Sequence, residues 1–155
     1  MVRKVVTGGE AGAEQAAWAA ARRAGVATGG YMPAGYRTEA GPAPRLGALH
    51  GAVEFPLDDA RRLRANLRRA DGLLWLGDAD SPAAAEALAA CRELSRPFLA
   101  ANPRFAPPEE AADWLLVFEI ETLVASGPPA SRDPEIGAIV SAYLDRVFLR
   151  LSRRS

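Results

Sequence analysis

Short apolar runs alternate with longer helix-forming stretches along almost the whole chain, and this alternation is the feature that most constrains the fold. The run "GLLWLG" at 72–77 is apolar throughout, which is typical of a strand buried on both faces. The stretch "SPAAAEALAACRELSRP" at 81–97 has helical spacing, with Ser81 as the expected N-cap before a first-turn proline. Repeated alternation of this kind predicts a parallel sheet with helices on both faces.

The pattern predicts one Rossmann-like α/β domain over residues 1–155, because a chain of this length can bury a single core without disulfides or structural metals. Strands are expected within 4–9, 26–30, 72–77, 97–103 and 120–127, and helices within 11–25, 57–72, 81–97, 107–119 and 133–155, the last with Asp133 as N-cap. Glycine and proline are dense from residue 31 to about 56, which predicts a long irregular loop, and such loops are usually functional or disordered.

Composition excludes several classes of protein. The 19 basic and 19 acidic side chains balance to zero, so the strong basic field of a nucleic-acid binder is missing. No apolar stretch approaches the roughly 20 residues that cross a membrane, and Gly8 and Gly9 interrupt the candidate core of a signal peptide. We therefore expect a cytoplasmic protein that binds neither nucleic acid nor membrane.

Single reactive side chains point to structural roles. Cys91 is the one cysteine, so an intramolecular disulfide or a paired-cysteine metal site is impossible, and helical spacing predicts that it is a core residue. His50 is the one histidine, and we interpret it as a loop residue rather than part of a catalytic triad. Trp18 is expected on a different helix face from Ala13 and Ala17, which should lie against the sheet.

Arginines crowd one side of the helix expected at 57–72. Because no aromatic side chains are interleaved with them, a solvated helix face is a better interpretation than a nucleic-acid footprint. The opposite side, with Leu63 and Leu67, should face the core.

Ligands of doubly wound sheets lie outside the carboxyl ends of the strands, where four of the five expected turns contain glycine. The turn "TGGEAG" at 7–12 leads into a helix whose free N–H groups and positive dipole end could receive an anion. Glu10 and Glu14 would repel an anion at this turn unless a metal ion or an arginine intervenes, and Arg37, Arg68 and Arg132 are the available counter-charges. Alternatively, the two acids serve only to stabilise the first helical turn.

Three ordered segments give the chain a family resemblance: "GGEAGAEQAAWAAARRAGVATGGYMPAGYRTEAGP", "NLRRADGLLWL" and "IETLVASGPPASRDPEI". In this order they resemble the molybdenum-cofactor carrier family, whose pattern is roughly GGQTGAD, GWCPKGRxAEDGP, NVRDSDG and LNVAGPRxS. More distantly, the chain is similar to the lysine-decarboxylase-like phosphoribohydrolases. The resemblance spans nearly the whole chain and implies a Rossmann-like fold, a ligand site at the strand ends and a homo-oligomer.

Carried over position by position, the resemblance and the turn analysis define a candidate ligand-binding set. Its members are Gly8, Gly9, Gly12, Ala13, Glu14, Gly30, Pro33, Gly35, Arg37, Glu39, Asn66, Arg68, Asp71, Gly127, Pro128 and Ser131. The resemblance implies a small anionic ligand, either the molybdenum cofactor or a mononucleotide. No catalytic residue and no metal ligand is assigned.

Departures from the family pattern fall where an anion is expected. Glu10 stands in place of a glutamine, Ala11 of a threonine, and Ala34, Tyr36 and Pro129 of basic residues. Each change removes a hydroxyl or a positive charge, or adds a negative one. The pocket should therefore grip anions less strongly than those of its relatives.

The sequence is compatible with three functions. The first, and preferred, is a non-catalytic carrier or sensor of a nucleotide-like or pterin-phosphate ligand. The second is a phosphoribohydrolase-like enzyme acting on nucleoside monophosphates through Glu14, Glu39 or Glu86. The third is a ligand-free oligomeric remnant of the family, whose subunits would meet through the apolar stripe from Ile136 to Leu151, although that stripe could simply pack inside the subunit.

Overall fold

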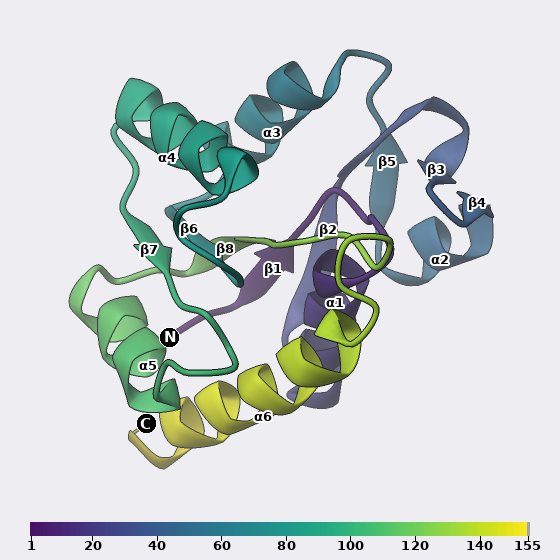
Figure 1. Cartoon of the computed structure of the whole chain (residues 1–155). Helices are drawn as coiled ribbons and strands as arrows, with labels where there is room; N and C mark the ends of the chain where they lie inside the picture. Colours follow the sequence, from purple (N-terminus) through teal and green to yellow (C-terminus); the bar gives the residue numbers. More distant parts are fainter. Residues whose placement is uncertain (155) are drawn as a thin grey trace.

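The computed structural model describes residues 1–154, in which the main sheet has six strands, all parallel, in the order β5-β2-β1-β8-β6-β7 (Figure 1). Their bounds are Lys4–Val6 (β1), Ala27–Met32 (β2), Ala52–Glu54 (β5), Gly72–Trp75 (β6), Phe98–Ala100 (β7) and Thr122–Ser126 (β8). The predicted class, a Rossmann-like α/β domain, is confirmed.

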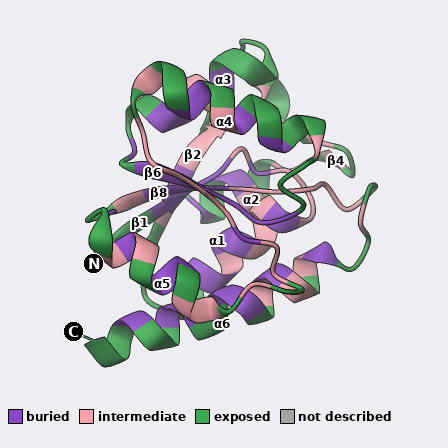
Figure 2. Cartoon of the chain, turned by 60° about the vertical axis from the view of Figure 1, so that its left-hand side comes forward, coloured by how far each residue is buried: buried purple, intermediate pink, exposed green. Residues whose placement is uncertain are grey.

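Helices cover both faces of this sheet. One layer holds α3 (Asp59–Arg68) and α4 (Pro82–Leu94), and the other holds α1 (Ala13–Arg23), α5 (Pro108–Val117) and α6 (Ile136–Arg154), as Figure 1 shows. Between the layers, β1, β6 and β8 form the buried centre (Figure 2). Every residue of β6 is buried, as its continuous apolar sequence predicts.

The apolar stripe of α6 is used inside the subunit. Ile136, Val140, Tyr143, Val147 and Leu151 are buried, in one cluster with side chains of α1 and α5. Small residues on α1, among them Ala13, Ala17 and Ala20, are fully covered by this packing. The stripe is therefore not available as the oligomer face considered above.

The region from 31 to 56 is not an irregular loop, so that prediction is wrong. It contains a short 3-10 turn, η1 (Ala34–Tyr36), a small antiparallel hairpin formed by β3 (Arg37–Thr38) and β4 (Gly41–Pro42), helix α2 (Pro44–Leu49) and the edge strand β5. Each piece is too short to show a clear hydrophobic period, and tertiary contacts decide its conformation.

Helix α2 also explains the positions of two aromatic side chains. Trp18 is fully buried rather than outward-facing, because α2 and β5 cover that side of α1. Its ring stacks on His50 with centroids 4.7 Å apart, and its indole N–H donates to the Gly29 carbonyl at 2.9 Å. His50 is consequently a buried residue at the end of α2, not an exposed loop residue.

Helix ends follow the sequence in one case and depart from it in another. Ser81 caps α4, with its hydroxyl accepting the Ala84 N–H at 3.2 Å. Helix α6 begins at Ile136 rather than directly after Asp133, and the Asp133 carboxylate pairs with both terminal nitrogens of Arg104, at 2.6 and 2.9 Å. Within residues 1–154, no helix is both long and apolar enough to span a membrane.

Candidate functional site

Strands β1 and β8 lie side by side at the centre of the sheet, and the turns that follow them are hydrogen-bonded together. We call residues 7–12 the β1 turn and residues 127–131 the β8 turn. The N–H of Ala130 donates to the Ala11 carbonyl at 2.8 Å, and the N–H of Ala13 donates to the Pro128 carbonyl at 3.2 Å. After β1 the strand order runs outward through β2 to β5, and on the other side of β8 it runs outward through β6 to β7. The direction of the strand order therefore reverses between β1 and β8, and the two turns flank this switch point, where ligands of such folds bind.

Glycines make this close approach of chain segments possible. A Cβ on Gly30, where φ is +132°, would lie 2.1 Å from the Thr7 carbonyl oxygen. On Gly12, where φ is +116°, it would lie 2.6 Å from the Ala130 nitrogen, and on Gly127 it would lie 2.6 Å from the Ala13 Cβ. Gly12 and Gly127 in the turns and Gly30 within β2 each lie against another chain segment, so they are required for contact between segments, whether or not a ligand binds.

Two carboxylates join the turns to the hairpin that follows β2. Glu10 Oε1 accepts the N–H of Ala11 at 2.8 Å and that of Glu39 at 2.9 Å. Glu39 Oε1 in turn accepts the N–H of Ser131 at 2.8 Å. Backbone donors from three separate segments are therefore directed at oxyanions that belong to the chain itself.

Glu14 adds a third carboxylate, half-buried in the first turn of α1. Its Oε1 accepts the N–H of Glu10 at 3.2 Å. Burial raises the pKa of Glu14 from 4.5 to about 7, and the nearby Glu10 charge adds to this rise, whereas hydrogen bonds from the backbone of Glu10 and Gly8 and the charge of Arg62 oppose it. Glu14 therefore changes its charge near neutral pH.

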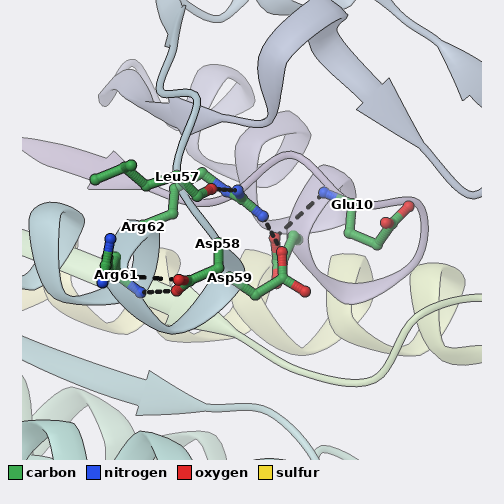
Figure 3. Close-up of polar contacts among 7 residues, drawn as sticks. Glu10, Leu57, Asp58, Asp59, Arg61 and Arg62 are labelled. Atoms are coloured by element: carbon green, nitrogen blue, oxygen red, sulfur yellow. Dashed lines mark hydrogen bonds and ion pairs between the residues drawn. The ribbon is translucent and has the colours of Figure 1, made fainter.

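Arg62 is a site residue that the sequence reasoning missed. It is buried on the inner side of α3, where its guanidinium donates to the Leu57 carbonyl at 2.8 Å and pairs with Asp59. Figure 3 shows this side chain on the side of α3 that faces the β1 turn with Glu10. The arginine-rich pattern predicts a solvated face at this position. The sequence signal that points to Arg62 is Asn66, a second polar residue one turn further along the same face, which is also buried.

Other predicted site residues fall into two groups. Pro33, Gly35 and Arg37 lie in the segment after β2 that leads to Glu39, and Asn66 supports the end of β2 by accepting the Tyr31 N–H at 2.9 Å. Arg68 ends α3 and is exposed.

Asp71 lies at the amino ends of the strands. Its carboxylate accepts the N–H groups of Glu121 and Thr122, at 3.0 and 2.9 Å, where β8 begins. Because α3 runs antiparallel to the strands, Arg68 and Asp71 lie at the amino ends of the strands, away from the β1 and β8 turns at the carboxyl ends.

A hollow also lies beside the turns rather than over them. A groove of about 670 Å³ runs between α1, α2 and the start of α6 and meets the turns at Gly12 and Ala130. His50 lines it, and burial first, then the charge of Arg22, lowers the pKa of its imidazole. Because the converging N–H donors lie in the turns, we take the turns rather than this groove as the candidate site.

The chemistry of the site is that of hydrogen-bond donors facing oxyanions. Backbone N–H groups at a helix start are ready-made receptors for phosphate-like groups. In the part of the chain that the structure describes, no group of three or more histidine, cysteine, aspartate or glutamate side chains is arranged to hold a metal ion. The backbone N–H groups of the turns and of Glu39 are arranged in a way that suits a phosphate-like group.

Fold and site together define a single-domain Rossmann-like protein with its candidate site at the central switch point. A model of the circularly permuted YpsA SLOG family matches residues 5–148, and the chain belongs to that family. It is also similar to a solved structure from Syntrophus aciditrophicus SB, named "putative molybdenum carrier protein", with 28% identity and a TM-score of 0.83 over 96% of this chain and 95% of that one. The comparison with curated proteins found no match.

Proposed function

We propose that this protein is a non-catalytic carrier or sensor that binds a small oxyanion-bearing ligand, a nucleotide-like or pterin-phosphate molecule, at the β1 and β8 turns. One observation carries the proposal: the N–H groups of Ala11, Glu39 and Ser131, from three separate segments, all donate to carboxylate oxygens at 2.8 to 2.9 Å. Donors arranged for carboxylates are equally suited to a phosphate or molybdate oxygen.

The helix behind the β1 turn supports the proposal. Gly12 is the N-cap of α1, and the positive end of the helix dipole faces the turn. The N–H of Ala13 is bound to a backbone carbonyl, that of Pro128. The loop donors instead face carboxylate oxygens, which a ligand oxyanion can replace, so these donors, and not the first helical N–H, would contact the ligand. The name of the similar solved protein, a molybdenum carrier, agrees with a ligand that carries oxyanions.

Nuclear magnetic resonance on the ¹⁵N-labelled chain tests the proposal. We expect adenosine monophosphate, molybdate or molybdenum cofactor to shift the amide signals of Ala11, Glu39 and Ser131. The amides of Glu121 and Thr122 are matched controls, because they donate to the Asp71 carboxylate in the same type of bond at the opposite edge of the sheet. Absence of binding by all three ligands at millimolar concentration would overturn the proposal.

A second candidate is hydrolysis of nucleoside monophosphates. The observation that favours it is the pKa of Glu14, raised to about 7 beside the differently placed Glu10, since such pairs of carboxyl groups can act as acid and base. Incubation with nucleoside monophosphates should then release free base, and Glu14→Gln should abolish that release. If wild type releases no base, this candidate is discarded.

Two further expectations accompany the carrier proposal. We propose a cytoplasmic location and a homo-oligomer, although the α6 stripe is already buried within the subunit. Light scattering at micromolar concentration tests the oligomer, and a mass equal to one chain would refute it.

A further inference from the structure

We propose that residues 33–43 form a strap over the candidate site and that the Glu39 carboxylate latches it, so that an anionic ligand enters by taking the place of the latch. This inference rests on the proposed function, because it concerns access to the same N–H donors. The base of the strap, around Gly35 and Tyr36, and its tip are held by different kinds of contact.

The base of the strap is firmly anchored. Tyr36 packs against the buried cluster of Trp18 and Met32, and its ring occupies the space where Gly47 has no side chain, 2.6 Å from where a Cβ would stand. The N–H of Gly35 donates to the Glu54 carboxylate at 2.6 Å. Opening therefore leaves the base in place.

The tip, residues 38–41, is held differently. Within the tip, the Thr38 hydroxyl donates to the Gly41 carbonyl at 2.8 Å and accepts the N–H of Ala40 at 3.1 Å. In residues 1–154, the hydrogen bonds that join this tip to other segments are those of Glu39: its N–H to Glu10 and its carboxylate to Ser131. Glu39 and Ala40 are exposed, so little apolar packing holds the tip closed.

The latch uses the same chemistry as the proposed ligand. The Ser131 N–H now bound to Glu39 Oε1 is released when the tip lifts, as is the Glu39 N–H bound to Glu10. A phosphate oxygen would then accept the freed donors, and one oxyanion replaces another. Since a hydrogen bond to a charged group contributes appreciably to stability, removing the latch should strengthen ligand binding by roughly tenfold or more.

Binding of adenosine monophosphate by wild type, Glu39→Ala and Glu39→Gln tests the latch. Glutamine keeps an oxygen that can accept the Ser131 N–H but loses the negative charge. Glu39→Gln therefore distinguishes an effect of the hydrogen-bonded latch from simple charge repulsion between Glu39 and the ligand. Glu121→Ala is the control, because it makes the same change of net charge at an exposed ion pair on the opposite edge of the sheet. Hydrogen exchange at the Ser131 amide reports the closed strap directly.

We expect Glu39→Ala to bind at least about tenfold more tightly than wild type and Glu121→Ala, with faster exchange at Ser131. Glu39→Gln should lie between them and keep most of the Ser131 protection. Equal or weaker binding by Glu39→Ala, or an equal gain in the alanine and glutamine variants, would overturn the strap while leaving the proposed function intact. If none of the four proteins binds adenosine monophosphate, molybdate or molybdenum cofactor, the proposed function fails and the strap fails with it.

Discussion

Glu14→Gln tests the electrostatics of the site through the stability of the fold. Glutamine has nearly the same shape as glutamate and keeps an oxygen that can accept the Glu10 N–H, but it cannot ionise. In the wild-type protein, folding raises the pKa of Glu14 from 4.5 to about 7, mainly through burial. Folding therefore favours the protonated form of this side chain.

The sign and size of the effect follow from linkage. Between about pH 4.5 and 7 the folded protein holds a proton that the unfolded chain has lost, so the contribution of Glu14 is fully present below that interval and is lost as the pH rises through 7. The difference between the two pKa values corresponds to about 3 kcal/mol of unfolding free energy. Glu14→Gln should be free of this loss.

Urea unfolding of both proteins at about pH 5 and about pH 8 measures the effect. On this change of pH, wild type should lose about 2 to 3 kcal/mol relative to Glu14→Gln, and the variant should be the more stable protein at the higher pH. His50, whose pKa is lowered, contributes stability that is present above its unfolded pKa and lost as the pH falls, but it is common to both proteins and cancels. Stability curves that stay parallel within about 0.5 kcal/mol would refute the assigned environment of Glu14.

Two other predictions concern the core. Gly30→Ala should destabilise the fold by at least about 3 kcal/mol, because the added Cβ would overlap the Thr7 carbonyl. Gly25→Ala is the control: Gly25 also has a positive φ but has open space around it, so this variant should lose only about 1 kcal/mol of stability. Similar thermal unfolding temperatures for the two variants would contradict the close packing of the turns. Burial raises the pKa of the Cys91 thiol to about 11, so its reaction with a disulfide reagent at neutral pH should be at least about a hundredfold slower in the folded protein than in urea, and comparable rates would show that the thiol is accessible.

Strongly periodic or wholly apolar segments could be predicted from the sequence. Strand β6 and helix α4 follow from local patterns, a continuous apolar run and a serine–proline start, and both formed as expected. Cys91 is buried for the same reason, because helical spacing alone places it on the inner face of α4. In these segments local preference and tertiary packing agree.

Other features depended on neighbours that a local pattern does not reveal. Trp18 is buried because α2 covers a second face of α1, and α2 itself was hidden in a segment rich in glycine and proline. Asp71 follows an arginine-rich helix in sequence, but the antiparallel course of that helix takes it to the edge of the sheet away from the turns. The partners of Glu10 and Glu39 come from distant segments, so that only the folded chain could show that the proposed anion donors are already occupied.

The position of β8 also has a consequence for synthesis. Lys4 pairs with Thr122, so β1 meets one of its central neighbours only after residues 5–121, which lie between them, have been synthesised. At about 5 to 20 residues per second, β1 waits roughly 6 to 24 s for that partner. Until then the centre of the sheet lacks β8, and the unpaired edges of β1 and β6 are accessible to chaperones.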